Sequence, residues 1–471
     1  METFSQFKQK FYARQSDLSI FDCEDFNLLK VILDGLKVDY LKRGIYHQPI
    51  FQNTWLNALT LLAKKAKYNG RIRMARKKCK EVSSELTVPY FFFDNGRVSE
   101  DIHGEKVSFY FSKIERYLGS QNCTTLYQTL TSLKQGETIS NLFLATHFDF
   151  YSREDKSFIR HLKGTYLKIE RCQVFDSNEL FNIRVAINKF FDEYRFWRFL
   201  LIKSRVKFAL FDEHYHREGF ILALKRKKIG AIELQHGLIA PEDIFYVFPQ
   251  QVAKIRERAL FPEKIFTYGT YWSDILKKGF EFSPSQIDVL GAYQEINTYL
   301  SLEQKKQMDH FLNGSSFVLI TTQTSLHSYF VAYARWLSGD MLKKAKDVKI
   351  VVKIHPSEKM DDYMDLIEIE NVRVFPFNTE YLLSRCSWHV SCYSTTLYDA
   401  TKYNCNNYSL LIEQCKDYID TFVNEGISTG INSDQSPLDT QPMKGSAVKF
   451  DKRTLYEDFE NNKHKLKQLE I

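Results

Sequence analysis

Short apolar runs recur along this chain, and most are followed at once by polar or glycine residues. In the middle of the chain they cover 206–211, 231–234, 265–269 and 287–291, and further on 317–320, 348–353, 372–375 and 389–392. Segments with helical spacing of apolar residues separate them, as in 217–228. Runs of this length are typical of buried strands. Strands that alternate with helices predict parallel sheets with right-handed crossovers.

The remaining segments give a less regular pattern. Strands are expected at 18–21, 38–41, 89–93 and 141–145, and helices at 26–36, at 52–85 and, as long amphipathic helices, between 120 and 200. The polar stretch 428–447 is expected to be an exposed loop, and 452–469 a charged amphipathic helix. A chain of 471 residues is too long for one ordinary core. We therefore expect two α/β domains, at 1–295 and 296–450, followed by a C-terminal helix at 451–471.

Composition narrows the class of protein. Apolar residues make up 44% and charged residues 26% of the chain, and no apolar run reaches eighteen residues. The polar, acid-bearing start at 1–6 is unlike a signal peptide, so a cytosolic location is expected. The eight cysteines are scattered singly without a CxxC pair, which gives no support to a zinc knuckle or a redox motif.

The net charge of +7 is concentrated in basic clusters, chiefly over 64–80 and again at 225–228. The denser cluster suits contact with an anionic membrane or an acidic polymer, and a solvated helix face is the alternative. Nucleic acid is not an expected partner, because no recognised DNA- or RNA-binding motif accompanies the charge.

Polar residues follow two neighbouring strands of the first domain. Asp212 and Glu213 come directly after the strand 206–211, and His236 follows the strand 231–234 within Gln235-His236-Gly237. Ligands on parallel sheets bind at the carboxyl ends of the strands. The carboxylates suit general-base work on a sugar hydroxyl, with helix capping as the alternative. His236 suits contact with an acceptor hydroxyl or a donor phosphate, and Gly237 suits close backbone approach or a positive φ.

Two further expectations concern this loop. Adjacent residues at a strand end point in opposite directions, so one carboxylate should face the ligand while the other caps a helix or pairs with Arg217. The longer Glu213 is favoured as the base. His214 and His216 beside the acids also suggest a metal cluster, but their spacing matches no established ligand motif, so no metal is predicted.

The second domain carries its own polar strand ends. Thr322 and Gln323 lie in the loop after 317–320, and His355 precedes a proline at the end of 348–353. Ser394, Thr395 and Thr396 sit where a strand becomes a helix, so free N–H groups, the helix dipole and hydroxyls favour an anion there. Simple N-capping and an ordinary turn histidine are the alternatives. Asp399, one turn into that helix, suits ribose hydroxyls.

These motifs, in this order, are similar to bacterial GT-B enzymes that build capsules and lipopolysaccharide. The similarity covers about 205–405 and is carried by segments at 233–237, 266–276, 289–291, 353–356 and 393–400. Relatives of this kind include sialyl- and polysialyltransferases, capsule Kdo transferases and the glycerophosphotransferases of teichoic acid synthesis. The resemblance implies two Rossmann-like domains facing a central cleft. It also implies that His355, Ser394 and Thr395 hold the donor phosphate and that Asp212 or Glu213 is the base.

The leading hypothesis is a metal-independent glycosyltransferase without a resident cofactor. Its substrates would be a nucleotide-activated sugar, with a CMP-sugar favoured, and a growing glycan or glycolipid acceptor at the inner membrane. The alternatives are a CDP-polyol phosphotransferase of the same fold, a nucleotide-sugar 2-epimerase and a non-catalytic assembly subunit. The apparent lack of a second acid/base set argues against the epimerase.

Overall fold

The computed structural model describes residues 4–36, 77, 79–83, 86–100, 105–127, 153–241, 243, 245–295, 300–323, 326–344, 346–356, 358–375, 377–403, 405–441 and 451–470. The chain forms two compact units. The N-terminal unit comprises Phe7–Glu295 and Tyr456–Ile471, and the C-terminal unit comprises Met1–Gln6 and Ile296–Leu455. The strands expected at 38–41 and 141–145, and nearly all of the helix at 52–85, lie outside the described residues.

The N-terminal unit contains a six-stranded sheet in the order β10-β9-β8-β7-β3-β6, with every neighbouring pair parallel. Along the chain, β3 comes first of these strands. The next strand, β6, pairs with one edge of β3, and the strand after it, β7, pairs with the other edge. The point where strand order reverses therefore lies between β3 and β7. The strands are β3 (Tyr90–Asp94), β6 (Cys123–Tyr127), β7 (Phe208–Phe211), β8 (Gly230–Leu234), β9 (Lys264–Thr267) and β10 (Ile287–Val289).

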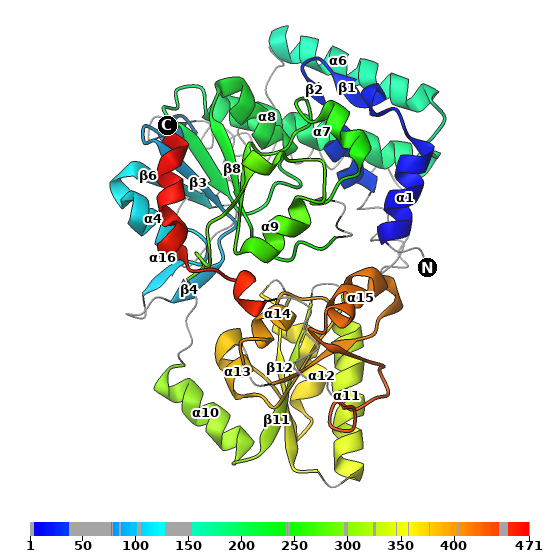
Figure 1. The fold of residues 1–471 in the computed structure, drawn as a ribbon, viewed down its shortest axis with the longest axis vertical. Helices are drawn as coiled ribbons and strands as arrows, with labels where there is room; N and C mark the ends of the chain where they lie inside the picture. The colour runs from blue at the N-terminus through cyan, green and yellow to red at the C-terminus, as the bar shows by residue number, and fades with distance from the viewer. Residues whose placement is uncertain are drawn as a thin grey trace. The chain divides into compact units, whose positions relative to one another are not determined.

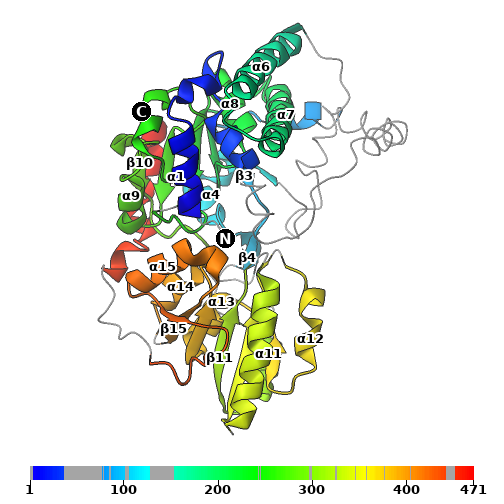
Figure 2. The same ribbon diagram turned by 90° about the vertical axis from the view of Figure 1, so that its right-hand side faces the viewer.

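Aromatic side chains fill the core beside β3. Phe91 and Phe93 pack against Trp197 and Phe220 on one face of the strand, while Phe92 stacks on Phe111 on the other. The strand is thus covered on both faces, as expected for a parallel sheet. The helices of this unit are α1 (Phe4–Arg14, within the unit from Phe7 on), α4 (Ser112–Leu118), α6 (Arg153–Arg171), α7 (Ser177–Leu200), α8 (Glu218–Lys227), α9 (Thr270–Leu276) and α16 (Phe459–Asn462), as Figures 1 and 2 show.

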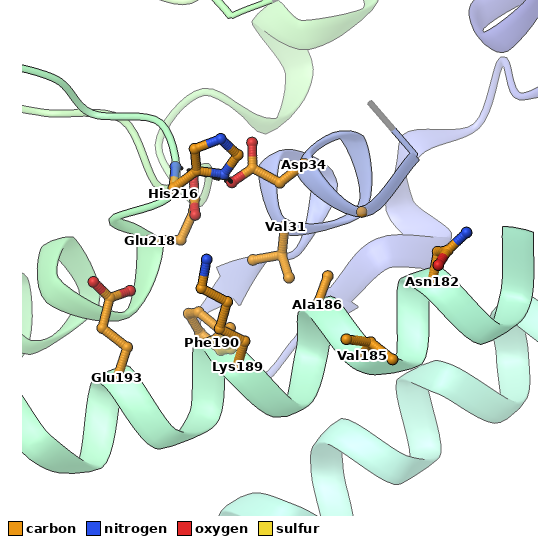
Figure 3. A pocket seen from close by; sticks show the side chains of 11 residues that line it. Val31, Asp34, Asn182, Val185, Ala186, Lys189, Phe190, Glu193, His216 and Glu218 are labelled. Atoms are coloured by element: carbon orange, nitrogen blue, oxygen red, sulfur yellow. Dashed lines mark hydrogen bonds and ion pairs between the residues drawn. The ribbon is translucent and has the colours of Figure 1, made fainter. Parts of the chain in front are cut away.

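Two helices approach α7 closely at glycines. A Cβ on Gly219 of α8 would lie 2.6 Å from the backbone oxygen of Phe190, and one on Gly35, in the helix at 29–36, would lie 3.0 Å from that of Asn182. Because real Cβ atoms essentially never come within 3.0 Å of a neighbour, Gly219 is required for the α7–α8 contact. Figure 3 shows the helix that carries Val31 lying over α7.

The C-terminal unit contains a second six-stranded parallel sheet, in the order β13-β12-β11-β14-β15-β16. Numbered within the unit this is 3-2-1-4-5-6, the strand order of dinucleotide-binding folds, with the reversal between β11 and β14. The strands are β11 (Ser316–Thr321), β12 (Val348–Lys353), β13 (Val372–Val374), β14 (Trp388–Ser391), β15 (Asn406–Leu410) and β16 (Thr429–Ile431).

Helices cover both faces of this sheet. One apolar layer joins β11, β12 and β14 to α11, α12 and α15, and the other joins β11 and β12 to α10, α13 and α14. The helices are α10 (Leu302–Leu312), α11 (His327–Lys343), α12 (Met364–Ile367), α13 (Thr379–Arg385), α14 (Thr396–Ala400) and α15 (Lys416–Asn424). The predicted fold class, α/β with two Rossmann-like parallel sheets, is confirmed.

Three local expectations are corrected. Leu18–Phe21 is a 3-10 helix rather than a strand, because the carboxylate of Asp17 accepts the N–H of Ser19 and caps a turn. The segment expected to be a loop from 428 contains β16. The C-terminal tail is not one helix but a 3-10 turn at Lys452–Thr454, α16, and a 3-10 helix at Lys463–Glu470. Short antiparallel pairs, β1 (Asp22–Cys23) with β2 (Phe26–Asn27) and β4 (Val98–Glu100) with β5 (Lys106–Ser108), complete the fold.

Candidate functional site

The loop between β7 and α8 lies at the strand-order reversal of the N-terminal unit. Asp212 and Glu213 follow directly after Phe211, the last residue of β7. Asp212 is fully buried, whereas the side chain of Glu213 is 23% exposed. Both carboxylates therefore occupy the edge of the sheet at which ligands of parallel α/β folds bind.

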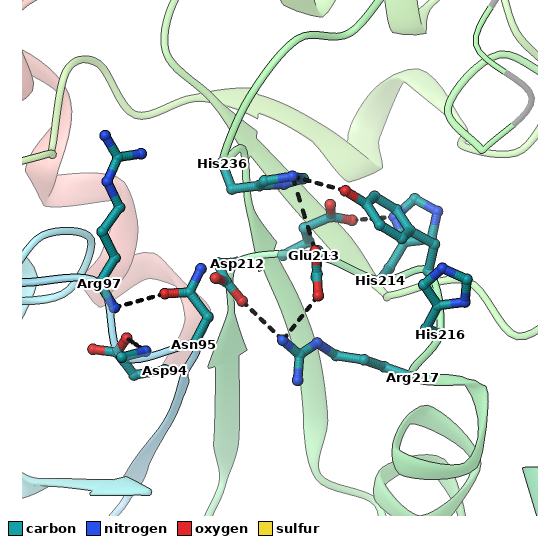
Figure 4. Close-up of polar contacts among 12 residues, drawn as sticks. Asp94, Asn95, Arg97, Asp212, Glu213, His214, His216, Arg217 and His236 are labelled. Atoms are coloured by element: carbon teal, nitrogen blue, oxygen red, sulfur yellow. Dashed lines mark hydrogen bonds and ion pairs between the residues drawn. The ribbon is translucent and has the colours of Figure 1, made fainter. Parts of the chain in front are cut away.

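Arg217 joins the two carboxylates. Its Nη2 lies 3.2 Å from Oδ1 of Asp212 and 3.2 Å from Oε1 of Glu213 (Figure 4). Its guanidinium stacks 3.9 Å from the ring centre of Phe93. The pairing with Arg217 was expected for one carboxylate only. Both carboxylates pair with Arg217 because they come after the end of β7, where side chains no longer alternate between the two faces of the sheet.

The two carboxyl groups differ in charge state although they share this cation. Burial raises the pKa of Asp212 to about 8, and the charges of Glu213 and Asp94 add to that increase against the effect of Arg217. Burial also works to raise the pKa of Glu213, but Arg217 and His236 outweigh it and hold that pKa below its ordinary value. Glu213 is thus ionised at neutral pH, while Asp212 is mostly protonated. The buried Oδ2 of Asp212 has no hydrogen-bond partner among the described residues.

His236 lies next to this pair and is held by two tyrosines. Its Nε2 is 2.9 Å from the hydroxyl of Tyr215 and 3.9 Å from Oε2 of Glu213, and its Nδ1 is 3.5 Å from the hydroxyl of Tyr246. Tyr246 in turn donates to buried Glu233 at 2.6 Å. The structure therefore brings Asp212, Glu213 and His236 together.

Gln235 and Gly237 flank His236 in the chain. Gln235 accepts the N–H of Tyr268 at 2.9 Å and donates to the carbonyl of Gly237 at 2.8 Å, which ties β8 to β9. Gly237 has no positive φ, and among the described residues a Cβ there would meet nothing within 4 Å. Close approach of its backbone to a ligand stays a prediction.

The histidines of the loop are engaged in other ways. His214 is fully buried, with Nδ1 bonded to Glu233 and Nε2 bonded to the carbonyl of Phe245 at 2.8 Å, so both ring nitrogens are occupied. His216 pairs with Asp34 at 2.7 Å. Within the described ranges no group of three or more His, Cys, Asp or Glu residues is arranged to hold a metal ion. The alternative of a His214–His216 metal cluster is therefore not supported.

Asp94 is a site residue that the sequence did not indicate. It ends β3 opposite β7, is fully buried and accepts bonds from the Ser108 hydroxyl at 2.5 Å and the Gly96 N–H at 2.7 Å. Burial raises its pKa. The sequence around it, Asp94-Asn95-Gly96, indicates only a turn; the β3–β7 pairing places this acid within electrostatic reach of Arg217 and Asp212.

The C-terminal unit gathers hydroxyl groups at its own strand-order reversal. Oγ1 of Thr321, at the end of β11, lies 3.0 Å from Oγ1 of Thr396 and 2.9 Å from Nε2 of His389. His389 is fully buried, and burial lowers its pKa to about 4, so it is neutral. Ser394, Thr395 and Thr396 are half-buried at this edge.

The loops after β11 and β12 are bonded to one another. The backbone N–H of His355 donates to Oγ1 of Thr322 at 2.9 Å and to Glu358 at 3.0 Å, while the Thr322 hydroxyl donates to Glu358 at 2.5 Å. These bonds fix the backbone of His355 and leave the residue exposed. Thr322 thus positions the loop of His355. Gln323 has a comparable role, since its Oε1 accepts the N–H of Tyr393 at 2.9 Å and links the loops after β11 and β14.

The helix after β14 is short. α14 has five residues, Thr395 makes no side-chain capping bond, and Ser394 accepts the N–H of Thr396 at 3.3 Å. The helix dipole is therefore a smaller contribution to an anion site than the sequence suggested. Asp399 pairs with Lys402 at 3.2 Å and is 20% exposed.

The basic cluster at 64–80 lies almost entirely outside the described residues, as do 324 and 325 of the β11 loop. In the part of the chain that the structure describes, no helix is long and apolar enough to cross a membrane.

Comparison with known proteins found likeness at the level of fold. No family model matches the sequence, and no curated protein matches it. Among solved structures, the chain is similar to Staphylococcus aureus MnaA with UDP, at 10% identity, covering 82% of this chain and 96% of that one, with a TM-score of 0.48. It is similar to the Methanocaldococcus jannaschii UDP-GlcNAc 2-epimerase (11%, 81% and 99%, TM-score 0.46) and to a glycosyltransferase from Rickettsia africae (12%, 81% and 97%, TM-score 0.41).

Proposed function

We propose that this chain is a glycosyltransferase that moves a sugar from a nucleotide-activated donor, with a CMP-sugar favoured, to a growing capsule or lipopolysaccharide glycan. The observation that carries the proposal is the carboxylate pair on Arg217 beside His236, at the ligand-binding edge of the N-terminal sheet. One ionised and one protonated carboxyl group at a single site supply a proton acceptor and a proton donor.

In this proposal Glu213 is the base. It takes the proton from an acceptor hydroxyl as that oxygen bonds to the anomeric carbon of the donor. The bond between the anomeric carbon and the phosphate oxygen breaks, and the electron pair leaves with the nucleotide. The protonated Asp212 and His236 hydrogen-bond substrate oxygens at this edge. The C-terminal unit holds the donor phosphate through exposed His355 and the hydroxyls of Ser394, Thr395 and Thr396.

A nucleotide-sugar 2-epimerase is a second candidate, and one observation favours it. Sequence reasoning argued against epimerisation for lack of a further acid/base set, but Asp94, Asp212, Glu213 and His236 gather at one sheet edge. Epimerisation at C2 exchanges a carbon-bound proton with water. Deuterium at C2 of nucleotide sugar recovered from D₂O would therefore favour the epimerase, whereas transfer leaves C2 unlabelled.

The remaining alternatives differ in product. A CDP-polyol phosphotransferase leaves the phosphate on the product and releases CMP, whereas a CMP-sugar transferase releases CMP and leaves no phosphate on the product. A non-catalytic assembly subunit binds nucleotide without turning it over. The basic segment at 64–80 would hold the enzyme against an anionic membrane that carries the acceptor.

Nucleotide binding tests the donor side of the proposal. Calorimetry with CMP, UDP and GDP should show binding with a preference for CMP, and His355→Ala should weaken it by about tenfold or more, the cost of losing a bond to a charged group. His310→Ala, an exposed histidine on α10, is the matched control and should bind as the wild type does. Unchanged affinity in a folded His355→Ala protein would contradict the role given to His355.

A further inference from the structure

The N-terminal unit contains a cavity of about 340 Å³ that none of the proposed catalytic residues lines. Its walls come from three segments: the helix at 29–36, α7, and the start of α8 with the loop residue His216 (Figure 3). The volume lies in the range of small-molecule sites. The side chains that matter below are Val31, Asp34, Val185, Phe190, Glu193 and His216.

The cavity has a rigid frame. Gly35 and Gly219 bring the two neighbouring helices onto α7 at either side of it. His216 has a φ of +61°, which is uncommon for a residue with a side chain. Both its N–H (2.9 Å) and its Nδ1 (2.7 Å) bond to Oδ2 of Asp34, which holds it in that conformation. Backbone conformations of this kind are concentrated at binding sites.

Two charged groups of the cavity are paired within the protein. Asp34 pairs with His216, and Glu218 pairs with buried Lys30 at 3.2 Å. Burial lowers the pKa of His216, but the bond and the charge of Asp34 raise it more strongly. Burial raises the pKa of Glu193 to about 8, so this group is largely neutral, and the side chain of Lys189, which also lines the cavity, is exposed. An uncharged ligand would leave these pairs intact.

One hydrogen-bond acceptor of the cavity nevertheless remains open. Asp34 is 7% exposed, and its Oδ1 has no donor among the described residues. Glu193 receives the N–H of Gly219 on Oε2 at 2.9 Å, so in its neutral form Oε1 carries the proton and can donate to a ligand. A buried acceptor without a donor costs free energy, which a ligand with hydroxyl groups would recover. The opposite wall is apolar, with Val31, Val185 and Phe190.

We infer that this cavity binds one neutral pyranose ring, whose hydroxyls donate to Asp34 and accept from Glu193 and whose C–H face packs on Val31, Val185 and Phe190. The assignment of this ring to the acceptor glycan rests on the proposed function. It is supported by the loop 212–218, which lines the cavity with His216 and Glu218 and carries Glu213 and Arg217 at the catalytic edge. The charge of His216 acts on Glu213, so the two sites lie within electrostatic reach of one another.

The test uses methyl glycosides of glucose, galactose, mannose and N-acetylglucosamine with the full-length protein, by saturation-transfer NMR. At least one should bind, with a Kd on the order of 1 mM for a ligand of this size. Val185→Trp fills the cavity from a half-exposed position and should abolish the signal. Leu167→Trp, on α6 and comparably exposed (45% against 49% for Val185), is the matched control and should keep it.

A second variant, Glu193→Ala, removes the carboxyl group that donates to the ligand and should weaken binding by about tenfold or more. The inference is overturned if no glycoside binds to the wild type, or if binding survives in Val185→Trp with an unchanged Kd. Glycoside binding in a protein that turns over no nucleotide sugar would instead contradict the proposed function and leave the cavity as a sugar site.

Discussion

Burial, rather than distance from Arg217, determines how the two acids of the β7–α8 loop differ. The Nη2 of Arg217 is equidistant from both carboxylates, yet Asp212 is fully buried and Glu213 reaches the surface. The desolvated acid keeps its proton and the partly solvated acid loses it, as charge repulsion within a close pair requires. Glu213 alone is therefore proposed as the base.

Substitution of each acid separately tests that assignment. Glu213→Gln should lower turnover of the nucleotide sugar by roughly 10²–10⁴-fold, the usual contribution of a positioned base, while nucleotide affinity stays unchanged. Asp212→Asn keeps a hydrogen-bonding group and should lose less. If Asp212→Asn showed the larger loss, the roles would be reversed. If neither variant lost turnover, His236 would be the next candidate.

The charge state of Asp212 has a consequence for stability. Its folded pKa of about 8 lies above the ordinary value, so the unfolded state releases this proton first as pH rises. Its contribution to stability is therefore complete below about pH 4 and is lost as pH rises towards 8. In urea unfolding, Asp212→Asn should gain stability relative to the wild type over this range, by at most about 1.4 kcal/mol per pH unit. A relative loss would show that Asp212 is ionised when folded.

At the scale of elements, the position of the β7–α8 loop depends on the packing of α8 against α7. A Cβ on Gly219 would lie 2.6 Å from the Phe190 oxygen and the Tyr194 nitrogen, both backbone atoms that have little room to move. Gly219→Ala should therefore destabilise the protein by about 1–3 kcal/mol in urea unfolding, as overpacked sites do.

Gly164→Ala on α6 is the matched control, because a Cβ there meets nothing within 4 Å. It should stabilise by about 0.5–1 kcal/mol through helix propensity alone. Equal effects of the two substitutions would show that the α7–α8 contact is looser than described.

The sequence predicted those elements whose pattern is set by burial on both faces. β7, β8, β11, β12 and β14 are mostly apolar runs, and each ends within two residues of its predicted bound. β15, with the sequence Asn406-Asn407-Tyr408-Ser409-Leu410, was missed because polar side chains occupy buried or half-buried positions there: Asn407 bonds to His389, and Ser409 bonds to Ser428. Tertiary partners, rather than the local pattern, make this segment a strand.

The same distinction holds for the candidate site. Asp212, Glu213 and His236 were predictable because each follows a recognisable strand. Asp94 also follows a predicted strand, 89–93, but its place near Asp212 depends on the pairing of β3 with β7, which the sequence did not indicate. The contacts of Tyr215 and Tyr246 with His236 likewise arise from tertiary structure. Likewise, Arg217 can pair with both Asp212 and Glu213 only because β7 ends at Phe211. The sequence predicts the end of a strand only to within one or two residues.

At the scale of the whole molecule, the two units supply different chemistry. The N-terminal unit concentrates carboxyl groups at its strand-order reversal, and the C-terminal unit concentrates hydroxyls and a neutral histidine. In the proposed reaction the hydroxyls and His355 meet the phosphate charge, so no divalent ion is needed. EDTA should then change the rate of nucleotide-sugar turnover by less than about twofold, because it removes no group that takes part in the reaction. Activity lost in EDTA and restored by Mg²⁺ or Mn²⁺ would contradict this.

The central claim is that the chain consumes a nucleotide-activated sugar. The most direct measurement incubates the wild-type protein with CMP-, UDP- and GDP-sugars, with and without the methyl glycosides, and follows free nucleotide and sugar product by mass spectrometry. We expect release of nucleotide, fastest from a CMP-sugar, with the sugar recovered on water or glycoside and without added phosphate. Donors that all remain intact, or that only change configuration at C2, would contradict it.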